Sequence, residues 1–149
     1  MNANAEIILI KSDGSIILQQ RDDKPNITNP GYVSSFGGAI EEGESPHQAA
    51  YRELYEETSL RPPFESLKFF KQYTKSIDIH GEDREIYYFL LKDVSEEDFR
   101  VYEGQGYVVL KSENQMNTYK ITIMLQQALH DYYASLLQIR DWLGIIEYS

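Results

Sequence analysis

The most informative feature of this sequence is a group of three glutamates on one face of a short predicted helix. Glu53, Glu56 and Glu57 stand at i, i+3 and i+4, so their carboxylates lie within about one helical turn of each other. Like charges at this spacing repel each other and destabilise an isolated helix. Clustered carboxylate oxygens are the ligands that Mg²⁺ and Mn²⁺ prefer. The spacing therefore indicates a divalent-metal site of the kind that also binds substrate phosphates.

The start of this helix is marked by three consecutive signals. Ser45 is a typical N-cap residue, Pro46 suits the first helical position, and Gln48 completes a capping box. The apolar positions that follow predict a helix to about Thr58. The helix cannot continue far beyond that point, because two prolines follow at 62 and 63.

The surrounding stretch resembles the Nudix box, Gly-x5-Glu-x7-Arg-Glu-(apolar)-x-Glu-Glu-x-Gly-(apolar). The matching residues are Gly38, Glu44, Arg52, Glu53, Leu54, Glu56, Glu57 and Leu60. Ser59 departs from the pattern, because it stands where the motif has its last glycine. A left-handed residue commonly ends a helix there, so Ser59 puts the helix cap in question but leaves every charged position intact.

The rest of the chain alternates predicted strands with a second long helix. Strands are expected over Ala5–Lys11, Ser15–Gln20, Tyr32–Phe36, Leu67–Thr74, Glu85–Lys92 and Tyr107–Leu110. Apolar residues at helical spacing predict the second helix from Ile121 to Leu137. The pattern alone is compatible with an α+β fold or a mixed α/β sandwich. Resemblance to the Nudix family implies one domain over residues 1–149, an α/β/α sandwich with a mixed β-sheet.

Composition restricts the partners of such a chain. The net charge of −10 over 149 residues argues against long nucleic acids, which need a basic surface. The sequence has no cysteine, which suits a reducing cytoplasm. No apolar stretch reaches the length of a membrane span, and the run around Glu6 is too short for a signal peptide. We therefore expect a cytoplasmic protein that binds small anionic substrates.

The resemblance also implies roles for the charged residues of the box. Glu56 and Glu57 are expected to bind Mg²⁺ or Mn²⁺, together with the backbone carbonyl of Gly37. Glu53 is expected to act as a further metal ligand or as a base. Arg52 is expected to hold these carboxylates in place through charge-assisted hydrogen bonds, although an ordinary surface ion pair is the simpler alternative.

Three residues outside the box are weaker candidates. Glu103 lies in Glu-Gly-Gln, which looks like the segment that supplies an additional metal ligand or base in MutT-type members. Arg21 stands where MutT-like members have an arginine that contacts phosphate. Asn117 precedes the second helix and could bind a base edge, but asparagine is common near helix starts in any case.

These observations predict hydrolysis of a diphosphate linkage in a nucleoside diphosphate derivative. The sequence markers of ADP-ribose, dinucleoside polyphosphate, coenzyme A and NADH hydrolases are missing, which favours a nucleoside triphosphate or a similar substrate. A sugar-nucleotide hydrolase and a catalytically silent nucleotide-binding module remain alternatives. Trp142, Leu143 and Ile146 extend the apolar surface past the second helix and suggest a homodimer contact, or a tail that folds back on its own domain.

Overall fold

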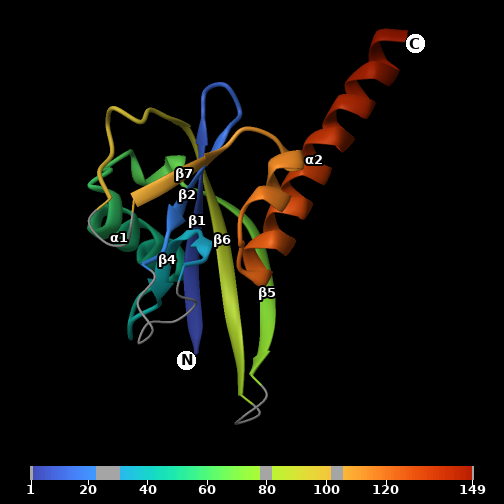
Figure 1. Ribbon diagram of the computed structural model, residues 1–149. Helices are drawn as coiled ribbons and strands as arrows, with labels where there is room; N and C mark the ends of the chain where they lie inside the picture. The colour runs from blue at the N-terminus through green and yellow to red at the C-terminus, as the bar shows by residue number, and fades with distance from the viewer. Residues whose placement is uncertain (1, 23–30, 78–81, 102–105, 149) are drawn as a thin grey trace.

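A computed structural model of the chain describes residues 2–22, 31–77, 82–101 and 106–148, without the side chains of 77, 82 and 140–148. In these residues seven strands form one mixed sheet (Figure 1). The strands are β1 (Ala3–Lys11), β2 (Ile16–Gln20), β3 (Val33–Ser34), β4 (Phe36–Ala39), β5 (Lys68–Ile77), β6 (Glu82–Val94) and β7 (Gly106–Leu110). The helices are α1 (Pro46–Thr58) and α2 (Ile123–Tyr148), with short 3₁₀ helices η1 (Phe64–Ser66) and η2 (Glu113–Thr118).

Strand order places the centre of the sheet on β1. The order is β3-β2-β1-β6-β5, with β4 paired to β1 and β7 paired to β2. β1 and β6 are parallel, and the other pairs are antiparallel. β4, which carries the two glycines of the box, therefore lies beside the central strand.

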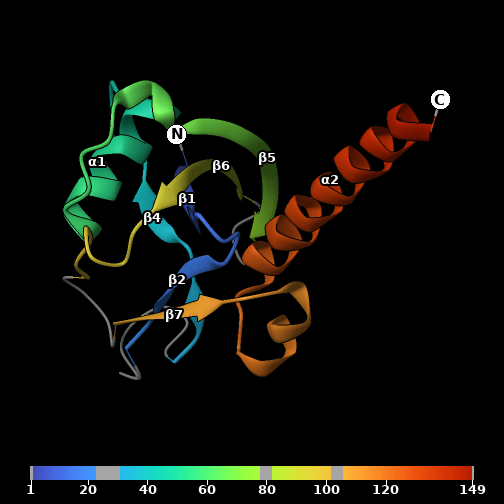
Figure 2. The same ribbon diagram turned by 90° about the horizontal axis from the view of Figure 1, so that it is seen from above.

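The two helices cover opposite faces of the sheet (Figures 1 and 2). Successive residues of a strand point to opposite faces. On β1, Ile7 and Leu9 thus pack in the cluster that contains Leu54 of α1, whereas Ile8 packs in the cluster that contains Leu125 of α2. The predicted α/β/α sandwich with a mixed sheet is confirmed.

Helix α1 begins as the sequence predicts. The Ser45 side chain accepts a hydrogen bond from the Gln48 N–H (3.1 Å), and the Gln48 side chain accepts one from the Ser45 N–H (2.8 Å). At its other end Ser59 is left-handed, with φ of 65°, and its N–H donates to the Tyr55 carbonyl (2.9 Å). The departure from the motif has therefore kept the glycine-like backbone conformation of the helix end.

Because a side chain is strained in this conformation, Ser59→Gly is expected to stabilise the protein by about 0.5–1 kcal/mol. Chemical denaturation of the two proteins measures the difference. An unchanged or lowered free energy of unfolding would show that contacts of the serine side chain outweigh the backbone strain.

Several element boundaries differ from the prediction. The expected strand Tyr32–Phe36 is two strands, β3 and β4, and β4 continues through Gly37 and Gly38, which pair with β1. β5 and β6 are longer than expected. η2 was not predicted. Helix α2 starts at Ile123, since Ile121 forms a bridge to Val33 instead.

The last turns of α2 extend away from the sheet (Figures 1 and 2). The described apolar side chains Leu136, Leu137 and Ile139 on this helix are exposed. Those of Trp142, Leu143 and Ile146 lie outside the described residues, so the dimer contact stays a prediction. In the described part of the chain, no helix is long and apolar enough to cross a membrane.

Candidate active site

Arg52 connects the acidic loop before α1 to the carboxylates on the helix. Its guanidinium donates two hydrogen bonds to the Glu44 carboxylate (2.7 and 2.9 Å). The same group donates to Glu53 (3.0 Å), to Glu56 (3.2 Å) and to the Ala39 carbonyl (3.1 Å). The arginine thus fixes Glu53 and Glu56 against both the loop and the end of β4, which is far more than one surface ion pair would do.

The two glycines of β4 make room for carboxylates on both sides of the strand. A Cβ atom on Gly37 would lie 2.1 Å from Oε2 of Glu6, and one on Gly38 would lie 2.6 Å from Oε1 of Glu53. Gly37 also has φ of 146°, a conformation that side chains rarely adopt. Glycine is therefore required at both positions, because Glu6 from β1 and Glu53 from α1 press against the same short strand.

The Glu53 and Glu57 carboxyl groups lie close together on α1, and each changes the pKa of the other. Burial is the main cause that raises the pKa of Glu57, to about 9, and the negative charges of Glu53 and Glu6 raise it further. Its hydrogen bond from the Gly37 N–H (3.2 Å) acts in the opposite direction. Burial also raises the pKa of Glu53. Removing the proton from Glu57 is therefore unfavourable in the metal-free protein at neutral pH.

Glu6 is a site residue that the sequence analysis did not propose. Its carboxyl group lies at the floor of the site, with long hydrogen bonds from Asn4 (3.5 Å) and Ser35 (3.4 Å). Burial raises its pKa to about 8, and the charge of Glu53 adds to this effect. A lone glutamate within the apolar run of β1 was the available signal, but sequence alone does not show that β1 lies beside the box.

The donor set of the box fits a divalent cation. Hard oxygen ligands are present on Glu53, Glu56 and Glu57, and a cation would offset the burial that raises the pKa of Glu57. In the described residues, no group of three or more His, Cys, Asp or Glu side chains is already arranged to hold a metal ion. Arg52 already binds the Glu53 and Glu56 carboxylates, so both would have to shift slightly to bind a metal ion.

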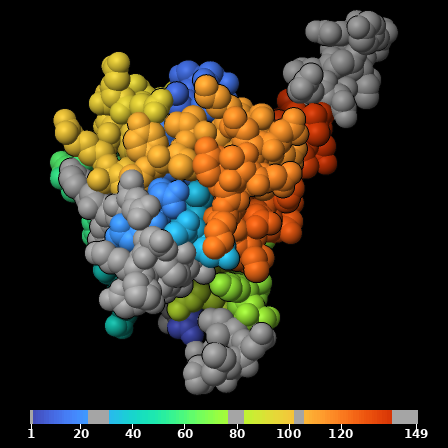
Figure 3. Space-filling model, viewed as in Figure 1, coloured from blue at the N-terminus to red at the C-terminus, as the bar shows by residue number. Residues whose placement is uncertain are grey.

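A pocket of about 740 Å³ opens beside these carboxylates, on the face of the sheet that α2 partly covers. Glu6, Gly37 and Glu57 line one end of it. Figure 3 shows this side of the molecule, with parts of β2 and β3 (light blue and cyan) visible beside the segment before α2 (orange). The pocket therefore reaches the box at Gly37, Gly38 and Glu57, while Arg52, Glu53 and Glu56 are not among its lining residues.

The other walls of the pocket combine positive charge with apolar surface. Its cationic residues are Arg21, Lys75 and Arg84. Its aromatic and aliphatic residues are Tyr32, Ile86, Tyr88, Ile123 and Met124. Walls of this kind suit a ligand that has both phosphates and a flat organic group.

The residues predicted outside the box are placed differently from one another. Arg21 lines the pocket, and its backbone N–H donates to the Tyr32 carbonyl (2.9 Å). Asn117 is exposed on η2 and is not among the residues that line the pocket, whereas Thr122 and Ile123, closer to the start of α2, line it. A base contact by Asn117 stays a prediction.

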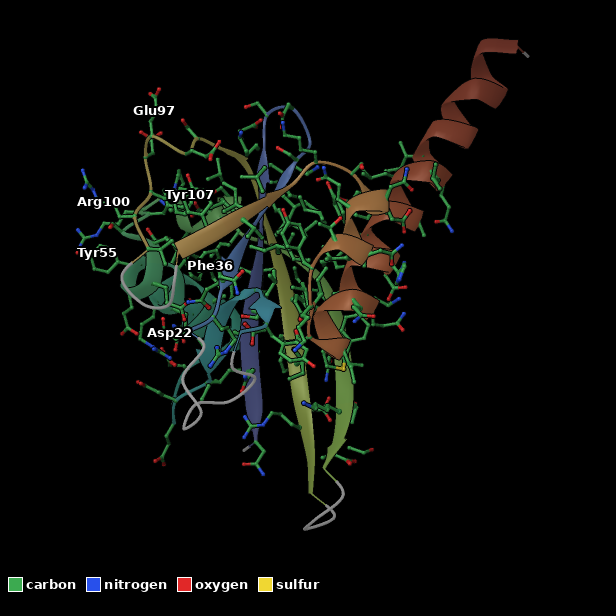
Figure 4. The ribbon with its side chains drawn as sticks, viewed as in Figure 1. Asp22, Phe36, Tyr55, Glu97, Arg100 and Tyr107 are labelled. Atoms are coloured by element: carbon green, nitrogen blue, oxygen red, sulfur yellow. The ribbon has the colours of Figure 1, made fainter. Side chains whose placement is uncertain are left out.

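Glu103 lies outside the described residues, but the chain on either side of it is placed. Arg100 precedes it, and its N–H donates to the Thr58 carbonyl at the end of α1 (3.0 Å). Figure 4 shows Arg100 near Tyr55 of α1, and Tyr107 above Phe36 of β4. The role expected of Glu103 therefore stays a prediction.

Comparison with known proteins assigns the family. The sequence model of the NUDIX domain matches residues 2–111, most of the chain up to the end of β7. The chain belongs to the NUDIX family. The residues matched include the box, Glu6 and the strand pair β5–β6, whereas α2 lies beyond them.

Curated NUDIX relatives match a part of the chain. An RNA pyrophosphohydrolase from Cereibacter sphaeroides is 44% identical over 63 residues, which are 42% of this chain and 35% of that protein. One from Aeromonas hydrophila is 36% identical over 59 residues, which are 40% of this chain and 30% of that protein. The chain thus spans about a third of the length of these relatives.

Solved structures extend the likeness of the fold to most of the chain. The E. coli dihydroneopterin triphosphate pyrophosphohydrolase has a TM-score of 0.69 and 20% identity, covering 89% of this chain and 94% of that one. A C. elegans Ap4A hydrolase has a TM-score of 0.69 and 20% identity, covering 93% and 99%. At these identities the comparison shows the fold alone.

The raised pKa values predict how the stability of the metal-free protein depends on pH. Glu6 and Glu57 hold their protons up to about pH 8 and 9 when folded, but lose them near 4.5 when unfolded. Between these values the folded state binds more protons, so the free energy of unfolding falls as pH rises. The carboxyl groups with lowered pKa values, such as Glu44, titrate below this window.

We expect the melting temperature in EDTA to fall by about 5 °C or more between pH 6 and pH 9. Glu6→Gln should reduce this fall. Melting curves at a series of pH values measure both proteins. A melting temperature that stays constant, or rises, over this range would contradict the burial of uncompensated carboxylates.

Proposed function

We propose that this protein is a divalent-metal-dependent hydrolase of a diphosphate linkage in a nucleoside diphosphate derivative, such as a nucleoside triphosphate. The observation that carries the proposal is the carboxylate cluster itself: Arg52 holds Glu53 and Glu56, and Glu57 lies at a pocket that has both cationic and apolar walls. Phosphoryl transfer depends mainly on positioning and on neutralising charge. A site that gathers mutually repelling carboxylates beside such a pocket is suited to that task.

Glu53, Glu56, Glu57 and the carbonyl of Gly37 would hold Mg²⁺ or Mn²⁺. When bound, such an ion neutralises phosphate charge and lowers the pKa of a water molecule. Glu103, from the neighbouring segment, is proposed as a further ligand or base. The protein itself positions these groups, because Arg52 ties Glu53 and Glu56 to the acidic loop.

The pocket residues would hold the substrate. Arg21 is proposed to bind a phosphate oxygen, which it can reach from the end of β2 beside Glu6. Tyr32 offers an aromatic ring for a nucleobase, and Ile123 at the start of α2 offers apolar contact. Water would attack phosphorus at the end of the pocket near Gly37 and break the bond to the bridging oxygen. Arg52 and Glu53 would serve as positioning and acid–base groups there.

A nucleotide-binding module without hydrolysis is the second candidate. It is favoured by the fact that the described carboxylates do not yet form a three-ligand metal group. It fails to explain why three repelling carboxylates and their arginine are all kept, since binding alone does not need them.

A phosphate-release screen over nucleoside triphosphates, dinucleoside polyphosphates, sugar nucleotides and short 5′-triphosphorylated RNAs, with Mg²⁺ or Mn²⁺, tests the proposal. The RNAs belong in the panel because the curated relatives are named RNA pyrophosphohydrolases. We expect turnover of at least one nucleotide. Tight binding of these ligands without any product would favour the non-hydrolytic module instead.

A further inference from the structure

Two cations stand directly opposite each other at the far end of the pocket. Lys75 on β5 and Arg84 on β6 are register partners in the antiparallel pair, and both line the pocket. Like charges directly opposite each other on a sheet are destabilising. Such a pair, lining a pocket in a chain of net charge −10, is a place where an anion could bind.

Among the side chains that the structure describes, no acidic group neutralises Lys75 or Arg84. Arg84 donates a hydrogen bond to the neutral amide oxygen of Asn4 (2.6 Å), which orients its guanidinium but brings no negative charge. Lys75 is exposed. Neither residue forms a salt bridge with a described side chain, whereas Lys71 on the same strand pairs with Asp131 (3.1 Å). The two charges therefore remain available to a ligand.

The sheet fixes how far this pair lies from the box. Gly37 is opposite Glu6, which is opposite Tyr88, and Arg84 lies four residues before Tyr88 along β6. Two strand spacings and four residues of strand give about 16 Å from Gly37 to Arg84, and Lys75 is one strand further away. A diphosphate held at the box does not extend over that distance, so a group beyond it must reach Lys75 and Arg84.

Between the two ends the pocket is lined by largely buried side chains of β6, since Ile86 and Tyr88 are 5% and 2% exposed. Arg84, Ile86 and Tyr88 alternate along β6, so all three face the pocket. An aromatic ring and an aliphatic side chain thus lie between the cations and the carboxylates. Along the pocket, the expected phosphate site at the box is followed by the apolar side chains of β6 and then by Lys75 and Arg84.

We propose that Lys75 and Arg84 bind a second phosphate of the substrate, which lies on the far side of the first nucleoside from the scissile diphosphate. This inference rests on the proposed function for the position of the diphosphate. The phosphate could be a 3′-monoester of a mononucleotide or the first internucleotide diester of a short RNA. Both offer anionic oxygens to a lysine and an arginine.

Steady-state kinetics with three adenosine substrates test the proposal and separate these sources. They are adenosine 5′-triphosphate, its 3′-phosphorylated form, and the dinucleotide pppApA. We expect kcat/KM to be about tenfold higher for at least one of the two extended substrates than for adenosine 5′-triphosphate. Preference for the 3′-monoester alone identifies a mononucleotide, and preference for pppApA identifies an RNA 5′ end.

The variants Lys75→Gln and Arg84→Gln should lower this ratio toward one. Lys68→Gln is the matched control, because Lys68 is an exposed lysine of the same strand that does not line the pocket. It should keep the wild-type ratio. Equal kcat/KM values for all three substrates in the wild type, or a ratio unchanged in both variants, would overturn the proposal.

Equilibrium binding separates failure of this subsite from failure of the proposed function. Calorimetry with adenosine 3′,5′-bisphosphate and adenosine 5′-monophosphate needs no turnover. We expect the bisphosphate to bind about tenfold more tightly, and Lys75→Gln and Arg84→Gln to remove the difference. If no substrate is hydrolysed but this difference is found, the subsite stands while the proposed function fails. Equal affinities in the wild type would refute the subsite whatever the catalytic result.

Discussion

Replacing Glu57 with glutamine is expected to lower kcat by about a thousandfold or more while the protein stays folded. Glutamine has nearly the same shape and keeps an oxygen that can accept the hydrogen bond from the Gly37 N–H. It cannot supply the negative charge that a divalent cation requires. The loss would therefore report on charge in the site and not on packing.

The same substitution should stabilise the metal-free protein at alkaline pH. Burial keeps Glu57 protonated up to about pH 9, so ionising it in the folded state costs free energy that glutamine avoids. Glu65→Gln, which changes an exposed residue of η1, is a suitable control and should alter neither property. Rates of the Glu57 variant within twofold of the wild type would remove Glu57 from the catalytic site.

The second large effect is the dependence of the hydrolysis rate on divalent metal and on pH. Turnover should be abolished by excess EDTA and restored by Mg²⁺ or Mn²⁺, and the optimum should lie on the alkaline side of neutrality. Cation binding requires an ionised Glu57, whose pKa burial raises to about 9, so apparent metal affinity should rise with pH. The attacking water must also lose a proton.

Rate measurements from pH 6 to 10, at several metal concentrations, test this expectation. At low metal concentration the rate should rise more steeply with pH than at saturating metal. Hydrolysis at the full rate in excess EDTA would contradict the metal requirement, and an acidic optimum would contradict the proton displacement.

The features that could be predicted from sequence are those formed by residues close together in the chain. The capping box of Ser45 and Gln48 lies within four residues, and the i, i+3, i+4 spacing of Glu53, Glu56 and Glu57 follows from helix geometry alone. The contact of Arg52 with Glu56 could also be predicted, because the two residues are one helical turn apart. Its paired hydrogen bonds to Glu44 were not, since they depend on how the acidic loop folds back.

The site residues that could not be predicted from sequence are brought together by strand pairing. Glu6 belongs to the site because β1 pairs with β4, and the cation pair exists because Lys75 is in register with Arg84. That register includes an irregularity between Phe69 and Lys71, which no local pattern reveals. A shift by one residue would turn the side chains of a strand to the opposite face. Such a shift would move Lys75 out of the pocket.

The central claim is that water attacks a phosphorus atom of a nucleotide bound in this pocket. Hydrolysis of the preferred substrate in ¹⁸O-labelled water, followed by mass spectrometry of both products, tests it most directly. The account predicts one labelled oxygen in a single phosphate-containing product of the wild type, and no labelled product above background with Glu57→Gln. Unlabelled products, or label outside the phosphate groups, would contradict it.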